Sequence, residues 1–171
     1  MTPKIFVIEG LLLDETGDEK NVDQAKVFLY DSSGTNLVEE FVVARNGKFK
    51  FDNEIIADHY TIMAYGNGSG NGGDRVHVTT ADITDLRIPL STEGLRSEVS
   101  VERGVGQLTV NWTDIPQAKS YNIYKNDRMI QNIVGDTSYV DIVAPGVPTS
   151  YFVRSIDLYD LEGPESNIVT E

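Results

Sequence analysis

The 171-residue sequence contains no cysteine, only two histidines and a single tryptophan. Without cysteine the chain cannot form a disulfide, a thiolate zinc site or a cysteine nucleophile. The two histidines, His59 and His77, do not form the His-x-x-x-His pair that holds a metal ion on a helix. We therefore expect no catalytic residues, no metal site and no cofactor.

Basic residues are also scarce, with 14 Lys and Arg against 27 Asp and Glu and a net charge of −13. Binding to nucleic acid or to an anionic membrane surface requires clustered basic residues, so neither is an expected partner. No apolar run reaches the ~18 residues of a membrane-spanning helix, and no membrane insertion is expected. The N-terminus lacks the basic and apolar segments of a signal peptide. The acidic run at residues 14–19 is interpreted as a solvated turn.

Apolar residues make up 40% of the chain, enough to form hydrophobic cores. They alternate in short runs that Gly, Asn, Asp or Pro interrupts about every ten residues, and no segment has helical periodicity. This pattern predicts an all-β fold of two tandem β-sandwich, immunoglobulin-like domains. The expected strands are residues 5–13, 25–30, 37–44, 48–51, 60–65, 75–79, 86–90, 108–112, 120–125, 129–134, 138–142, 150–157 and 166–170.

Two turn signals organise this pattern. The small, polar sequence Ser91-Thr92-Glu93-Gly94 predicts a linker at about residues 91–96, with one domain at 1–92 and the other at 97–171. Arg45-Asn46-Gly47 predicts a hairpin between strands 37–44 and 48–51, because Asn-Gly readily supplies the positive φ angles of a tight turn.

The first half carries a recognisable order of segments, which are residues 8–14, 22–31, 46–51, 60–64 and 85–90. In this order they resemble carboxypeptidase regulatory-like domains, which are prealbumin-type sandwiches related in shape to the B repeats of collagen-binding adhesins. The resemblance spans residues 5–90 and departs from the family pattern at His59, where a glycine usually precedes the tyrosine.

The second half resembles a fibronectin type III domain through residues 108–112, 121–125 and 149–155. The resemblance implies that Trp112 fills the core between the sheets and that the Tyr151 hydroxyl caps backbone at a corner. Similar modules occur in bacterial secreted polysaccharide-degrading enzymes. The resemblance therefore implies that this chain is a fragment, without its signal peptide, of a bacterial protein that is extracellular or lies at the cell surface. Its partners would be neighbouring domains and, in one alternative, polysaccharide.

The segment from Gly66 to Asp74 is the most unusual in composition, with five glycines and two asparagines. It lacks the Gly-Lys-Ser/Thr ending of a phosphate-binding loop and the repeated carboxylates of a calcium site. We interpret it as a flexible surface loop. The alternative is a sugar site with a stacking ring and planar hydrogen-bonding groups. Its residues would be Tyr65, Asn67, Asn71, Asp74, Arg75 and His77.

An apolar surface is predicted on the second half. If Tyr121, Tyr151 and Val153 point inward, alternation sends Tyr124, Phe152 and Ile156 outward on neighbouring strands. A contiguous exposed apolar patch usually marks a surface that contacts another domain or molecule. The candidates are the first domain, another domain of the parent chain and a separate ligand, and Tyr159 is expected to belong to the same surface.

Three functions remain open at this point. The pair of domains would act as a structural spacer, as a weak carbohydrate-binding module, or as an adhesin or virion-surface component with a protein partner. All three are accessory, non-catalytic roles.

Overall fold

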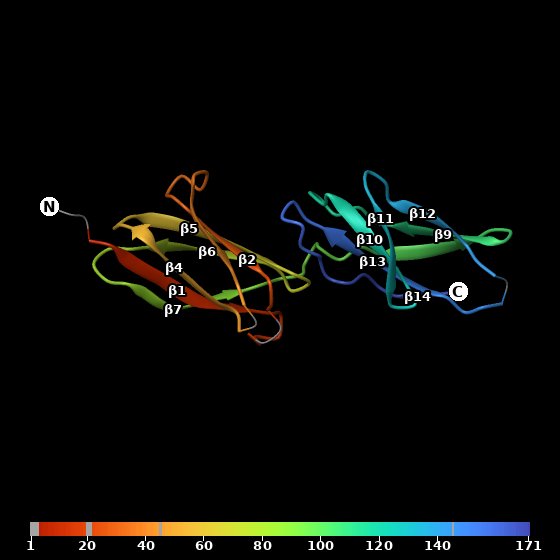
Figure 1. Ribbon diagram of the computed structural model, residues 1–171, viewed down its shortest axis with the longest axis horizontal. Coiled ribbons are helices and arrows are strands. Elements are labelled where there is room, and N and C mark those ends of the chain that lie inside the picture. Colours follow the sequence, from red (N-terminus) through yellow and green to blue (C-terminus); the bar gives the residue numbers. More distant parts are fainter. Residues whose placement is uncertain (1–3, 20–21, 45, 145) are drawn as a thin grey trace. The chain divides into compact units, whose positions relative to one another are not determined.

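The computed structural model describes residues 4–19, 22–44, 46–144 and 146–171, and every regular element in these ranges is a β-strand (Figure 1). The chain divides into two compact units, Met1–Thr92 and Glu93–Glu171, called here the first and second domains. The division falls inside the segment 91–96 that the sequence predicts as a linker. In the described ranges, no helix has the length and apolarity needed to cross a bilayer.

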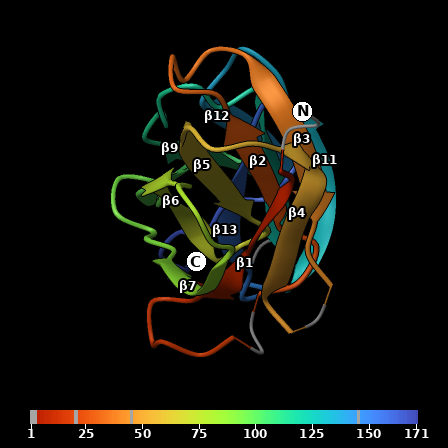
Figure 2. The same cartoon turned by 90° about the vertical axis from the view of Figure 1, so that its left-hand side faces the viewer.

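The first domain is a sandwich of two sheets, ordered β4-β1-β7 and β3-β2-β5-β6 (Figures 1 and 2). The parallel pairing of β1 with β7 is its only departure from antiparallel ladders among the described strands. The strands are β1 (Phe6–Leu13), β2 (Lys26–Tyr30), β3 (Leu37–Val42), β4 (Lys48–Ile55), β5 (His59–Gly66), β6 (Gly70–His77) and β7 (Ile83–Pro89).

Period-two alternation builds the first core. On β2, Val27 and Leu29 are fully buried between the sheets, and on β4 the side chains of Phe49 and Phe51 enter from the opposite sheet. Burial of each such side chain stabilises the fold by about 1.5–3 kcal/mol. The same alternation turns the residues between them to the outer faces of the sheets.

The second domain is also a two-sheet sandwich, ordered β12-β9-β8 and β11-β10-β13-β14, which is the arrangement of an immunoglobulin-like or fibronectin type III fold. Its Trp112 lies in the core, with its ring centroid 5.6 Å from that of Tyr121. The strands are β8 (Val99–Arg103), β9 (Gln107–Trp112), β10 (Ser120–Lys125), β11 (Arg128–Ile133), β12 (Ser138–Ile142), β13 (Ser150–Ile156) and β14 (Val169–Thr170). The all-β, two-sandwich prediction is confirmed, although β8 was not predicted.

The predicted hairpin between residues 37–44 and 48–51 is wrong, because β3 pairs with β2 whereas β4 pairs with β1. The chain crosses from one sheet to the other between them. Val43 and Phe49 both enter the core, and the Gly47 carbonyl accepts the Leu12 N–H at 2.8 Å, which fixes the crossing on β1. Arg45 of the predicted turn lies outside the described residues.

The interpretation of residues 66–74 as a flexible loop is also wrong for residues 70–74, although residues 67–69 form a turn. Gly70 to Asp74 belong to β6, which pairs with β5 without a register shift from Gly66↔Gly70 to His59↔His77. The glycines permit close backbone packing: a Cβ at Gly72 would overlap the Pro89 carbonyl oxygen. Asn71 and Ser91 exchange two backbone hydrogen bonds, at 3.0 and 2.8 Å, and so join β6 to the segment after β7.

Replacement of Gly72 by alanine should therefore destabilise the first domain by about 1–3 kcal/mol, because the added methyl group meets backbone that cannot move aside. Urea unfolding followed by circular dichroism measures the loss. The fluorescence of Trp112 reports the second domain separately.

A control for the added methyl group itself is Gly104→Ala in the second domain, where the group meets only the flexible side chain of Gln107. Its unfolding midpoint should stay close to that of the wild type. Equal midpoints for Gly72→Ala and the wild type would contradict the close-packing account.

Candidate functional site

Three aromatic side chains gather on the outer face of the first domain's β3-β2-β5-β6 sheet. The ring centroid of Phe28 lies 5.8 Å from that of Tyr65 in an edge-on arrangement and 6.4 Å from that of Tyr30. We call Phe28, Tyr30 and Tyr65 the aromatic face. Tyr65 was predicted as a stacking residue, whereas Phe28 and Tyr30 were not included. Alternation with Val27 and Leu29, which enter the core, places Phe28 and Tyr30 on this face. Phe28 is itself only 4% exposed, so the half-buried Tyr30 and Tyr65 supply the accessible ring surface.

The neighbouring strand β6 adds polar groups to this face. Asn71 lies opposite Tyr65 and Arg75 lies opposite Thr61. Between them Gly73 contributes no side chain, and a Cβ there would meet the Met63 sulfur at 3.1 Å. Because residues 71, 73 and 75 share one face of the strand, Asn71 and Arg75 flank the same outer surface as the aromatic face.

The structure does not bring all the predicted sugar-site residues together. Asp74 lies opposite the buried Ile62. Asp74 therefore belongs to the face of β6 that is opposite to the face of Asn71. Its carboxylate accepts the Arg75 N–H at 2.7 Å. His77 lies about 20 Å along the strand from Asn71, at 3.3 Å per residue, and pairs with His59.

Asn67 is exposed in the turn that joins β5 to β6. The predicted set thus splits. Tyr65, Asn71 and Arg75 border the aromatic face, His77 lies farther along the same face of β6, and Asn67 and Asp74 lie elsewhere. Ligand binding by any of them stays a prediction.

The predicted apolar patch of the second domain is not an open surface. Phe152 is 5% exposed and Ile156 is 8% exposed, so the expectation that both are exposed is wrong. Tyr124 and Phe152 stack in parallel, with ring centroids 4.6 Å apart and planes 7° apart. The Arg154 guanidinium lies 6.0 and 5.9 Å from their centroids. The stacked rings and the guanidinium cover apolar side-chain surface that strand alternation alone would leave exposed to solvent.

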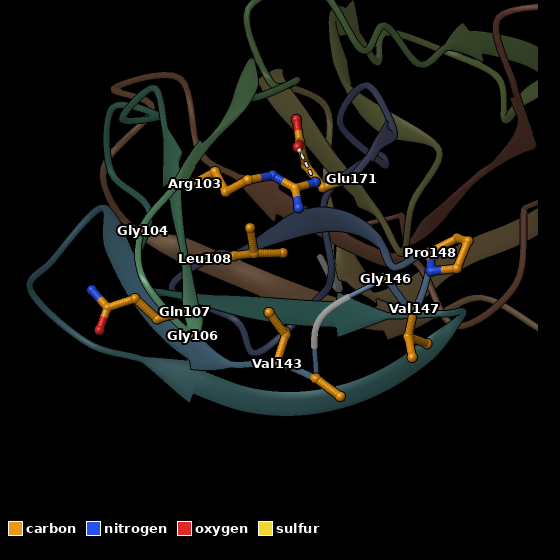
Figure 3. A pocket seen from close by; sticks show the side chains of 11 residues that line it. Arg103, Gly104, Gly106, Gln107, Leu108, Val143, Gly146, Val147, Pro148 and Glu171 are labelled. Carbon is orange, nitrogen blue, oxygen red and sulfur yellow. Dashed lines mark hydrogen bonds and ion pairs between the residues drawn. The ribbon is translucent and has the colours of Figure 1, made fainter.

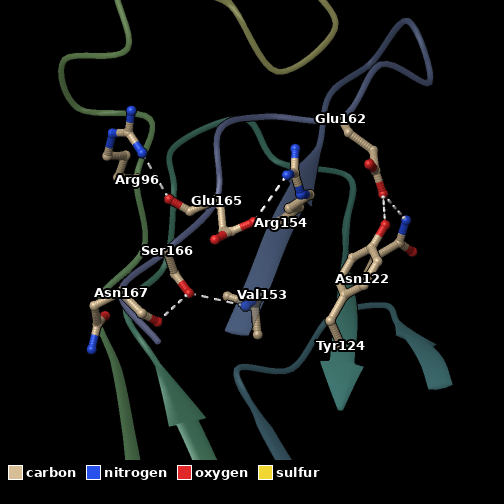
Figure 4. Close-up of polar contacts among 9 residues, drawn as sticks. All are labelled: Arg96, Asn122, Tyr124, Val153, Arg154, Glu162, Glu165, Ser166 and Asn167. Atoms are coloured by element: carbon tan, nitrogen blue, oxygen red, sulfur yellow. Dashed lines mark hydrogen bonds and ion pairs between the residues drawn. The ribbon is translucent and has the colours of Figure 1, made fainter. Parts of the chain in front are cut away.

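The segment after β13 holds this surface through polar contacts (Figure 4). Glu162 accepts hydrogen bonds from Tyr124 Oη and Asn122 Nδ2, both at 2.6 Å. Arg154 pairs with Glu165 at 3.1 Å. No local sequence signal links Glu162 to Tyr124, because they are far apart in the chain. A partner contact through Tyr124 or Tyr159 stays a prediction.

Tyr151 does not cap backbone as the fibronectin resemblance implied. Its hydroxyl donates to the carboxylate of Asp141, which also pairs with Lys125 Nζ at 2.6 Å. Asp141 is only 9% exposed and lies on β12, whereas Lys125 and Tyr151 lie on β10 and β13 of the other sheet. The hydrogen bond and the ion pair together offset the cost of burying the carboxylate and connect the two sheets.

Burial raises the pKa of Tyr121 and of Tyr124 from the ordinary value of 10 to about 12, and hydrogen bonds to Asp114 and Glu162 add to the rise. Burial and the hydrogen bond to Asp141 raise the pKa of Tyr151 as well. The unfolded chain therefore releases these protons first as the pH increases. The free energy of unfolding should be unaffected by them below pH ~10 and should fall by about 1.4 kcal/mol per pH unit for each tyrosine up to pH ~12.

Urea unfolding followed by Trp112 fluorescence at several pH values between 8 and 12 measures this slope. Tyr124→Phe removes one of the three tyrosines with a raised pKa and should make the slope shallower. An unchanged slope in that variant would show that Tyr124 ionises equally in the folded and unfolded chain.

Clefts open on the described surface of both domains. In the second domain, a cleft of about 320 Å³ is lined by Leu108, Val143 and Val147 and bordered by the Arg103–Glu171 ion pair, at 3.0 Å (Figure 3). In the first domain, a cleft of about 450 Å³ lies over β1, β4 and β7, where Phe41 and Phe49 meet charged residues of both signs. Neither cleft contains a histidine, and neither includes the aromatic face.

No protein-family model and no curated protein sequence matches the chain. Among solved structures, a pectate lyase from Erwinia chrysanthemi in complex with tetragalacturonic acid is similar to 44% of this chain, at 16% identity and a TM-score of 0.40. The chain covers 28% of that enzyme.

Two other structures are similar over most of this chain. A proposed carbohydrate-binding protein from Bacteroides uniformis is 14% identical, with 99% of each chain covered and a TM-score of 0.37. A two-domain fibronectin type III segment of chicken tenascin is 16% identical, with 88% of this chain and 83% of that chain covered and a TM-score of 0.38. At these values the comparisons assign no function, and the fold class follows from the sheet topology itself.

Proposed function

We propose that the chain is a pair of non-catalytic accessory domains whose first domain contacts polysaccharide through the aromatic face. The observation that carries this proposal is the grouping of the half-buried Tyr30 and Tyr65, both beside the buried ring of Phe28, with Asn71 and Arg75 on one sheet face. Aromatic rings offer flat apolar area, and the amide and guanidinium groups offer planar hydrogen-bond donors at its border. A sugar ring presents the complementary pattern of apolar C–H faces and equatorial hydroxyls.

The net charge of −13 favours a neutral polysaccharide over an anionic one, because long-range repulsion disfavours a polyanion. Two resemblances support the same role: that of residues 5–90 to carboxypeptidase regulatory-like domains, and that of the second domain to modules of polysaccharide-degrading enzymes. On this proposal the domains are part of a larger bacterial protein outside the cell or at its surface. Neighbouring domains of that protein would be their further partners.

A purely structural spacer is the second candidate. It is favoured by the polar contacts that hold the segment after β13 on the second domain and by the burial of Phe152 and Ile156. Both features make that domain a compact unit with less apolar surface for a separate protein partner. The two candidates differ in whether the first domain binds any glycan.

Affinity electrophoresis through gels that contain neutral polysaccharides, together with a glycan array, tests the proposal on the full chain. At least one neutral polysaccharide should retard the wild type. Tyr65→Ala should weaken binding by about tenfold or more, equivalent to about 1.4 kcal/mol, because it removes a stacking surface. Tyr30→Ala should act in the same direction.

Tyr65→Phe is the matched control, since it keeps the ring and removes only the hydroxyl, and it should retain most of the affinity. Circular dichroism establishes that each variant is folded. Absence of binding to every glycan, or equal binding by Tyr65→Ala and the wild type, would favour the spacer instead.

A further inference from the structure

The only two histidines of the sequence meet in the folded chain. His59 begins β5 and His77 ends β6, and the register of the two strands places them directly opposite each other. Their rings are stacked, with centroids 3.7 Å apart and planes 10° apart, and both residues are exposed. The pair lies at the opposite end of β5 and β6 from Tyr65 and Asn71.

The backbone ladder explains why the rings come so close. The Val78 N–H donates to the Asp58 carbonyl at 2.9 Å, so Asp58 and Val78 face each other as a hydrogen-bonded pair. In an antiparallel ladder such pairs alternate with non-hydrogen-bonded pairs, whose side chains approach most closely. His59 and His77 occupy the next, non-hydrogen-bonded position.

We propose that His59 and His77 together bind one divalent transition-metal ion, each through one ring nitrogen, with water completing the coordination sphere. Neutral imidazole is a common ligand for such ions, and the paired strands place the two side chains next to each other. The stacked rings lie in nearly parallel planes, so they must rotate about their side-chain torsions before both can direct a nitrogen at one ion. The described residues contain no group of three or more His, Asp or Glu side chains that could hold a metal ion. The site therefore has two protein ligands. Among divalent ions, Cu²⁺ binds nitrogen ligands most tightly.

This site is independent of the carbohydrate proposal, because it uses neither the aromatic face nor Asn71. One consequence is that an ion would connect the ends of β5 and β6 and would stabilise their pairing. Any ion that binds the folded state more tightly than the unfolded one has this effect.

The test uses the full chain, purified without a polyhistidine tag, and Cu²⁺ as the probe. Isothermal titration calorimetry should give one tight ion per chain. Electron paramagnetic resonance should show two imidazole nitrogens. Because the sequence has no other histidine and no cysteine, an imidazole signal can arise only from His59 and His77.

His59→Ala and His77→Ala should each lower the affinity by about tenfold or more, since the remaining imidazole binds without the gain of a second tethered ligand. Thr79→Ala, an exposed neighbour beyond His77, is the matched control and should bind as the wild type does. The proposal is overturned if either histidine variant binds Cu²⁺ as tightly as the wild type. It is overturned equally if the resonance spectrum shows fewer than two imidazole nitrogens.

Discussion

The close approach of the β6 backbone to its neighbours is the constraint on which the first domain depends. Gly72 has no side chain where the Pro89 carbonyl comes nearest, and this allows Asn71 to exchange hydrogen bonds with Ser91. The contact joins β6, at the edge of one sheet, to the segment that follows β7 of the other sheet. It also fixes the register of β6 on β5, so a single packing requirement decides which side chains share the outer face.

Both candidate sites follow from this register. It places Asn71 beside Tyr65 at one end of the hairpin and His77 beside His59 at the other. A slip of one residue would turn the polar residues of β6 toward the core and would separate the histidines. In the second domain, the buried carboxylate of Asp141 connects the two sheets, because it binds Tyr151 and Lys125 of the opposite sheet.

Much of this could be predicted from the sequence. Alternation located most of the strands, and the core position of Trp112 followed from the fibronectin resemblance. What could not be predicted depends on contacts between distant segments. Alternation assigned Phe152 to an outer face, but it could not show that Tyr124 and Arg154 cover that face. A run of glycines is compatible with a mobile loop or with a tightly packed strand, and only the contact with Pro89 and Ser91 distinguishes them.

Solution NMR of the full chain measures the register of β5 and β6 most directly. The account predicts a cross-strand nuclear Overhauser effect between the α-protons of His59 and His77, because non-hydrogen-bonded partners have the closest Cα atoms in the ladder. It also predicts slow hydrogen exchange at the amides of Asn71 and Ser91, which are bonded to each other. Absence of that Overhauser effect, together with rapid exchange and random-coil shifts over residues 70–74, would contradict it.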